Sequence, residues 1–185
     1  PDYAEAHSNL GNILNDLGKS EEAELSYRKA IKIKPDYAEA YANLGNILKN
    51  IGKLEDAELS IRKAIEIRPD FALIHYNLGN ILRDLGKLQE AELSIRKAIE
   101  IKPDLAQAHS NLGLILNDLG KLEDAELSYR KAIELRADYA EAHSNLGLML
   151  LQKGEYNVSL KYFSESAELL RGKEIKEPNH KRYTI

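Results

Sequence analysis

The sequence has no cysteine and no tryptophan among its 185 residues, and only one methionine and two phenylalanines. Without cysteine the chain has neither disulfide bonds nor thiolate ligands for a metal. Long apolar runs are also missing, whereas a membrane-spanning helix needs about 20 consecutive apolar residues. No signal peptide opens the sequence. These absences predict a chain without a membrane partner, and the cytoplasm is its expected location.

An excess of positive charge is missing too. The formal net charge is −4 at pH 7, whereas nucleic-acid-binding proteins usually carry a basic stripe. We therefore expect no nucleic-acid partner. The first three residues, Pro1-Asp2-Tyr3, repeat the internal Pro35-Asp36-Tyr37. This identity suggests that the sequence was cut from a longer one at a repeat boundary.

A period of 34 residues organises the chain. The recurring features are a Leu-Gly pair, a second glycine seven residues later and a closing proline, which Ala137 replaces once. The Leu-Gly pairs are Leu10-Gly11, Leu44-Gly45, Leu78-Gly79, Leu112-Gly113 and Leu146-Gly147. A fixed period in this range is typical of stacked repeats that bury their core between neighbours. We predict an array over residues 1–171, with units at about 4–37, 38–71, 72–105, 106–139 and 140–173. Residues 172–185 are predicted to be a linker or a disordered tail.

Each unit is predicted to contain two helices. In residues 38–71 the apolar positions of both halves are spaced by threes and fours, as in amphipathic helices. Asp36 and Glu39 have the spacing of a capping box, and Gly52 is placed to end the first helix in a left-handed conformation. Glu58 and Arg62 lie one helical turn apart, and we interpret this recurring pair as a solvated face.

The first glycine of each unit falls inside a helix, where it costs about 1 kcal/mol relative to alanine. Five repetitions of that cost require a packing reason. We expect each glycine to contact a small residue of the second helix, for example Ala57 opposite Gly45.

The order of these signals resembles the tetratricopeptide repeat (TPR). Leu-Gly, the turn glycine, an alanine five residues later, a large residue four further on, a second alanine and the proline follow the pattern of that family. The large residues are Tyr27, Ile61, Ile95, Tyr129 and Phe163. The usual tryptophan of the first helix is replaced by His7, Tyr41, His75, His109 and His143. The resemblance implies an all-α, right-handed superhelical solenoid of five helix-turn-helix units.

The segment Ala4 to Leu10 also resembles repeats of O-linked N-acetylglucosamine transferases and of repeat-rich bacterial proteins. The resemblance implies a module that binds an extended segment of another protein, without catalysis by this chain. The alternative is the substrate-recruiting repeat domain of a larger protein-modifying enzyme, such as a glycosyltransferase. A third interpretation is head-to-tail self-association of arrays with similar ends.

In this family the first helices of successive units line the concave side, which places a row of asparagines there. The row consists of Asn9, Asn43, Asn77, Asn111 and Asn145, with Asn12, Asn46 and Asn80 beside it. A carboxamide both donates and accepts hydrogen bonds, so this row matches the backbone of an extended peptide. The competing interpretation is that these asparagines pack or bond between units. Tyr76, Lys49 and Arg83 are the most distinctive flanking residues, and we expect them to anchor the ligand.

No constellation in the sequence indicates a catalytic or metal site. Four of the five histidines follow the repeat, and histidines one repeat apart lie about 9 Å or more from one another, too far to share a metal. A Ser-His-acid triad needs a unique arrangement, but the serines and histidines here are periodic. We therefore predict no catalytic residue, no metal and no cofactor.

Overall fold

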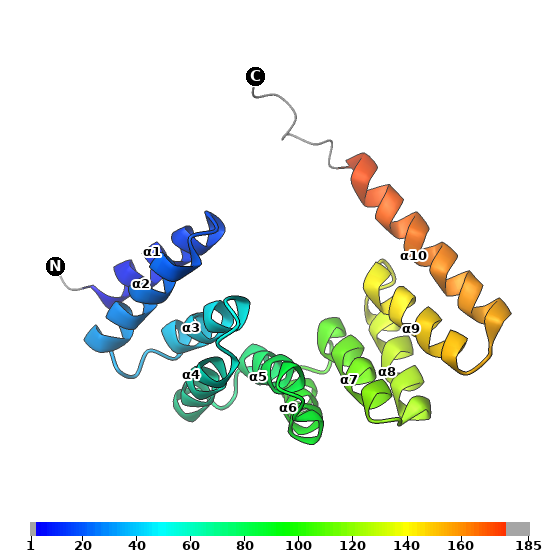
Figure 1. Cartoon of the computed structure of the whole chain (residues 1–185), viewed down its shortest axis with the longest axis horizontal. Helices are drawn as coiled ribbons and strands as arrows, with labels where there is room; N and C mark the ends of the chain where they lie inside the picture. The colour runs from blue at the N-terminus through cyan, green and yellow to red at the C-terminus, as the bar shows by residue number, and fades with distance from the viewer. Residues whose placement is uncertain (1–2, 177–185) are drawn as a thin grey trace. The chain divides into compact units, whose positions relative to one another are not determined.

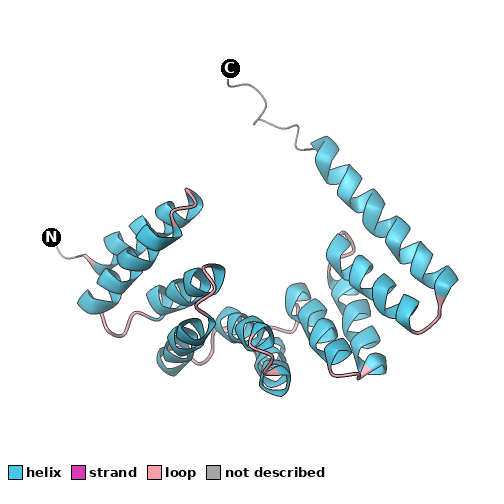
Figure 2. Ribbon diagram, in the orientation of Figure 1, coloured by secondary structure: helices cyan, strands magenta, loops and turns pink. Residues whose placement is uncertain are grey.

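The computed structural model describes residues 3–176, and its side chains as far as Gly172. These residues form ten α-helices joined by short loops and contain no strand (Figures 1 and 2). The chain divides into two compact units, residues 1–103 and 104–185. The prediction of an all-α chain built from five helical hairpins is confirmed.

Unit 1 contains three hairpins. Its helices are α1 (Ala4–Asp16), α2 (Ser20–Ile33), α3 (Ala38–Asn50), α4 (Leu54–Ile67), α5 (Ala72–Asp84) and α6 (Leu88–Ile101). Unit 2 contains two hairpins, and its helices are α7 (Ala106–Asp118), α8 (Leu122–Leu135), α9 (Ala140–Gln152) and α10 (Tyr156–Lys176). Within each unit the two helices of a hairpin pack together, and the second helix also packs on the first helix of the next hairpin. No helix of residues 3–176 is both long enough and apolar enough to cross a membrane.

The turn inside each hairpin forms as the sequence predicts. Gly52 has φ +80°, a conformation that a residue with a Cβ atom adopts only with strain. Its N–H donates to the carbonyl of Lys49 at 3.0 Å, and the N–H of Lys53 donates to the carbonyl of Leu48 at 2.8 Å. This pair of bonds is the Schellman motif, which satisfies carbonyls at the end of a helix.

The predicted capping boxes are wrong. Helix α3 is preceded by Tyr37, and no side chain caps its first turn. Asp36 lies one residue before the N-cap position, which Tyr37 occupies, and the backbone carbonyl of Asp36 accepts a bond from the N–H of Ala38 at 3.2 Å. Glu39 remains in the first helical turn, where its negative charge complements the helix dipole.

The glycine inside each first helix permits a close helix-helix approach. A Cβ atom at Gly45 would lie 2.5 Å from Cγ1 of Ile61 and 3.2 Å from the carbonyl oxygen of Ala57. The predicted contact with the alanine is therefore secondary, and the large residue one turn later fills the space. Tyr27 and Tyr129 occupy this space in the first and fourth hairpins.

The Glu-Arg pair is not a solvated face, because its carboxylate is largely buried and bridges two hairpins. The Glu58 side chain is 11% exposed, and it accepts hydrogen bonds from Arg62 at 2.8 Å and from Lys87 of the next hairpin at 2.7 Å. The same inter-hairpin bridge joins Glu24 to Arg28 and Lys53, and Glu126 to Arg130 and Lys153. In α10 the corresponding position is Leu160, which is exposed and has no carboxylate.

Helix α10 continues past the predicted array boundary at residue 171. It runs from Tyr156 to Lys176, so the first residues of the predicted linker are helical. The rest of that predicted tail, residues 177–185, lies outside the described residues.

Replacing Gly45 by alanine is expected to destabilise the chain. Alanine improves helix propensity by about 1 kcal/mol, but its Cβ atom would overlap Ile61, and overpacking typically costs about 1–3 kcal/mol. Gly172→Ala is the matched control, because its added Cβ atom meets no heavy atom within 4 Å. We expect a lower urea midpoint for Gly45→Ala and an equal or higher one for Gly172→Ala. Equal midpoints for the two variants would contradict the packing explanation.

The inter-hairpin bridge is expected to make stability depend on pH. Burial alone raises the pKa of Glu58, but hydrogen bonds and positive charge from Lys87 and Arg62 outweigh it, so the pKa is lowered from 4.5. A lowered folded-state pKa gives stability that is complete above the unfolded value and is lost as pH falls through the folded value.

Glu58→Gln should therefore cost about 1–2 kcal/mol at neutral pH, and the difference from wild type should shrink in acid, below the lowered pKa of Glu58. Urea titrations over a pH series would measure this. The control is Glu66→Gln, which removes an exposed pair with Lys63 on one helix and should cost less than about 0.5 kcal/mol. A loss for Glu58→Gln that does not change with pH would count against the bridge.

Candidate functional site

Three first helices of unit 1 present the predicted asparagines together. Helix α3 contacts both α1 and α5, and these helices carry Asn9, Asn12, Asn43, Asn46, Asn77 and Asn80. Asn9 is exposed, whereas the other five are half-buried. The remaining two predicted asparagines, Asn111 on α7 and Asn145 on α9, are half-buried in unit 2.

The hollow between α1 and α3 has a volume of about 190 Å³ and a lining rich in amides. Its asparagines are Asn12, Asn15, Asn43, Asn46 and Asn50. Asp16 is the one carboxylate among the lining residues, and Tyr27 and Ile47 form the apolar part. Three of the predicted asparagines, Asn12, Asn43 and Asn46, therefore line one hollow of unit 1.

Asn12 takes part in a structural hydrogen-bond network. Its Oδ1 atom accepts a bond from the Tyr27 hydroxyl at 2.7 Å and another from Nδ2 of Asn43 at 3.1 Å. Burial raises the pKa of Tyr27 to about 12, with smaller contributions from the charges of Asp16 and Glu39, so this hydroxyl stays a donor at neutral pH. For Asn12 and Asn43, bonding between neighbouring hairpins is thus part of their role.

Asn46 and Asn77 differ from that pair. Neither side chain has a hydrogen-bond partner within residues 3–176. Both line a second cavity of about 340 Å³ between α3 and α5, which Asn43 also lines. Their carboxamides are therefore available to a ligand, and each can donate and accept.

The second cavity also has an apolar wall that the sequence analysis missed. Ala38, Ala42, Phe71, Leu73 and Ile74 contribute to it, and Glu39 and Arg68 complete the lining. Phe71 and Leu73 are 41% and 47% exposed. A usable signal was present in the sequence, because Leu73 occupies a position that holds glutamate in three other repeats.

Two of the predicted anchor residues, Lys49 and Arg83, lie near the C-terminal ends of α3 and α5 and bond to the same carboxylate. The carboxylate of Asp84 forms ion pairs with Lys49 at 3.2 Å and with Arg83 at 3.3 Å. Tyr76 is half-buried and also interacts with another residue. These contacts tie α3 to α5, so a ligand that used Lys49 or Arg83 would have to compete with Asp84.

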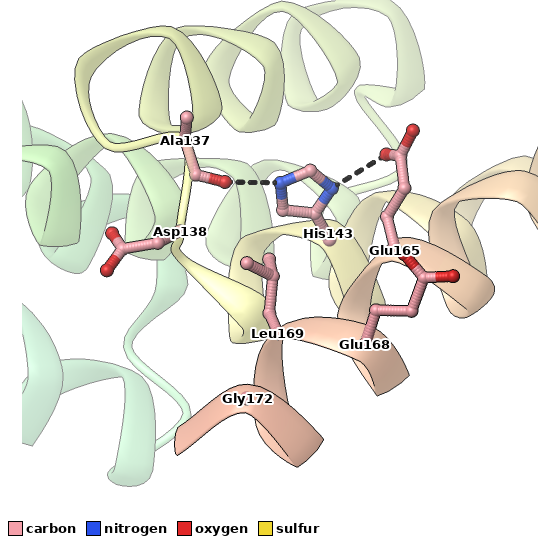
Figure 3. Close-up of a pocket in the computed structure, with 7 residues that line it drawn as sticks. All are labelled: Ala137, Asp138, His143, Glu165, Glu168, Leu169 and Gly172. Atoms are coloured by element: carbon pink, nitrogen blue, oxygen red, sulfur yellow. Dashed lines mark hydrogen bonds and ion pairs between the residues drawn. The ribbon is translucent and has the colours of Figure 1, made fainter. Parts of the chain in front are cut away.

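Unit 2 contains a hollow of about 450 Å³ at the surface between α9 and α10 (Figure 3). The buried His143 ring lies beside it, with Nε2 3.0 Å from the carbonyl oxygen of Ala137 and Nδ1 3.0 Å from Oε2 of Glu165. His75 makes the equivalent contact with Pro69 at 2.7 Å. Across residues 3–176, no group of three or more His, Cys, Asp or Glu side chains is arranged to hold a metal ion.

Comparison with known families identifies the repeats. The family profile described as "TPR repeat" matches residues 11–52 and 113–154, and the profile described as "Tetratricopeptide repeat" matches residues 38–71 and 72–105. These matches cover most of the chain and agree with the helical hairpins. The chain belongs to the tetratricopeptide repeat family.

Solved structures of the same fold are numerous. MamA is 27% identical with a TM-score of 0.79, and the match covers 90% of this chain and 97% of MamA. PilF of Pseudomonas aeruginosa is 24% identical with a TM-score of 0.82, over 89% of this chain and 75% of PilF. YrrB, a TPR protein with an unusual peptide-binding site, is 22% identical with a TM-score of 0.70, over 94% and 86% of the two chains. Comparison with curated proteins finds no match.

The hydrogen-bond network predicts different effects for two asparagines of α1. Asn12→Ala leaves the buried Tyr27 hydroxyl without its acceptor and should cost about 1–2 kcal/mol of stability. Asn9→Ala is the matched control, because Asn9 is exposed on the same helix and gains the same helix propensity. Its expected change is within about 0.5 kcal/mol. Chemical denaturation measures both, and equal effects would refute the structural role of Asn12.

Proposed function

We propose that the chain binds an extended segment of another protein on the surface formed by α1, α3 and α5 of unit 1, and that it performs no catalytic step. Proteins of the tetratricopeptide repeat family generally bind other proteins or peptides, and they are generally not catalysts. The observation that carries the finer proposal is the pair of free carboxamides, Asn46 and Asn77, at one cavity.

The chemistry of these carboxamides favours an extended ligand. An extended peptide presents unpaired N–H and C=O groups along its length, and each carboxamide can bond to both kinds. A helical ligand has already satisfied its backbone groups internally, so it would leave the carboxamides buried without partners, at a cost of about 1–3 kcal/mol each. YrrB supports the proposal, since it is a protein of the same fold with a peptide-binding site.

The other predicted positions enter the proposal with different roles. Asn43 contributes its remaining hydrogen-bonding capacity, while Asn12 holds Asn43 and Tyr27 in place. Asn9 extends the amide surface along α1, and Asn80 extends it along α5. In unit 2, Asn111 and Asn145 occupy the same repeat positions and are proposed to contact ligand there.

The test is binding of a positional-scanning library of short peptides, with both ends blocked, to the whole chain. The double variant Asn46→Ala/Asn77→Ala should bind the selected peptides at least about tenfold more weakly, because the hydrogen bonds of two neutral carboxamides are lost. Helical circular dichroism should be unchanged, since neither side chain supports the fold.

The control variant is Asn157→Ala, which changes an exposed asparagine of α10 outside the surface and should bind like wild type. Undiminished binding by the double variant would rule out this surface as the peptide site. Equal losses in the double variant and the control would point to a general effect on the fold instead.

A further inference from the structure

Three positions of unit 1 depart from the repeat in the same chemical direction. Ala42 stands where the other hairpins have Ser8, Tyr76, Ser110 and Ser144. Phe71 stands where they have Tyr3, Tyr37, Leu105 and Tyr139. Leu73 stands where they have Glu5, Glu39, Gln107 and Glu141. Ala42 removes a hydroxyl or a bulky ring, Phe71 removes a phenol hydroxyl and Leu73 removes a carboxylate. Only positions 42, 71 and 73 combine all three changes.

The fold brings these three departures to one place. Ala42 lies on α3, Phe71 immediately precedes α5 and Leu73 lies in the first turn of α5, and all three line the 340 Å³ cavity. We call this cavity the apolar pocket. Positions so far apart in sequence meet here because α3 and α5 are neighbouring first helices.

Each departure alters the pocket in a specific way. Ala42 is small and leaves open the space that a tyrosine ring would fill. Phe71 and Leu73 expose large apolar surfaces where most of the other hairpins have tyrosine and glutamate. The guanidinium of Arg68 lies 4.4 Å from the centre of the Phe71 ring, a cation–π contact that holds the ring at the rim.

The mixed lining defines what can occupy the pocket. Asn43, Asn46 and Asn77 stand beside the apolar wall, so an all-hydrocarbon occupant would bury carboxamides without partners. A purely polar occupant would leave the Phe71 and Leu73 surfaces in water. An extended peptide with a large apolar side chain satisfies both parts, because its backbone meets the carboxamides and its side chain covers the wall.

We propose that the apolar pocket is a specificity pocket, which takes one large apolar side chain of the bound segment, of the size of leucine, isoleucine, methionine or phenylalanine. This inference rests on the proposed function and adds the chemical class that the site selects. The amide row provides affinity for the ligand backbone, and the pocket sets which residue lies between α3 and α5.

The decisive variant is Leu73→Glu, which restores the residue that three other hairpins carry at this position and is therefore compatible with the fold. In unit 2, Gln107→Glu makes the same kind of change at the same repeat position and serves as the matched control. Circular dichroism and thermal melting should show both variants folded as wild type.

Wild type, screened with the same blocked-peptide library, should select a large apolar residue at one position. Alanine at that position should weaken binding about tenfold or more, the value expected for burial of one such side chain. Leu73→Glu should weaken binding of the apolar peptide similarly, and alanine in the peptide should then cost little further. Gln107→Glu should behave as wild type in both measurements.

Two results would overturn the specificity pocket and leave the proposed function standing. One is peptide binding that depends on Asn46 and Asn77 but shows no apolar preference at any position. The other is binding by Leu73→Glu at wild-type strength. Peptide binding that is insensitive to Asn46 and Asn77, or no peptide binding at all, would instead refute the proposed function, and with it the pocket.

Discussion

The approach of the two helices in each hairpin is the constraint from which the remaining geometry follows. Gly45 brings α3 so close to α4 that Ile61 occupies the space of the missing Cβ atom. A glycine inside a helix destabilises it by about 1 kcal/mol relative to alanine. Burial of the Ile61 side chain, which is fully buried, stabilises the fold by more than that amount. The left-handed Gly52 then reverses the chain in a turn short enough to keep the two helices in this contact. The same two glycines recur in every hairpin, and a large side chain of the second helix fills the gap beside each helical glycine.

Contacts between hairpins use a second kind of interaction. The Glu58 carboxylate is held by Arg62 on its own helix and by Lys87 on the next hairpin, while apolar side chains of α5 such as Leu78 and Ile81 are buried. Apolar packing is non-directional, whereas hydrogen bonds to a charged carboxylate require a defined geometry. The bridge therefore adds orientation to an interface whose stability comes mainly from burial. Of the asparagines on α1 and α3, Asn12 and Asn43 add a further bond between hairpins, whereas Asn46 takes no part in these contacts.

The parts of the structure that depend on local spacing could be predicted from the sequence, and those that depend on distant residues could not. The positions of the helices and the turn at Gly52 follow from period and residue type. The Glu58–Arg62 pair was visible as a one-turn spacing, but its third member, Lys87, belongs to the next repeat, so burial of the carboxylate was missed. The prediction of a capping box at Asp36 was wrong because α3 begins one residue later than the box requires. The spacing of Asp36 and Glu39 in the sequence does not reveal this difference.

The same limit applies to the site and to the joint between hairpins. The 34-residue period predicted the row of asparagines. It did not predict the apolar wall of the second cavity, because Ala42, Phe71 and Leu73 depart from the residues that the other repeats carry. The inter-hairpin bridge has the opposite property, since each complete repeat carries the bridging lysine just before its second helix and the glutamate inside that helix, as Lys53 and Glu58 do in residues 38–71. A duplicated or deleted block of one full period, for example residues 38–71, leaves a matched Lys-Glu pair at every new junction. Gene duplication can therefore lengthen or shorten such an array without a compensating mutation, except directly after α10, where Leu160 offers no carboxylate to a following lysine.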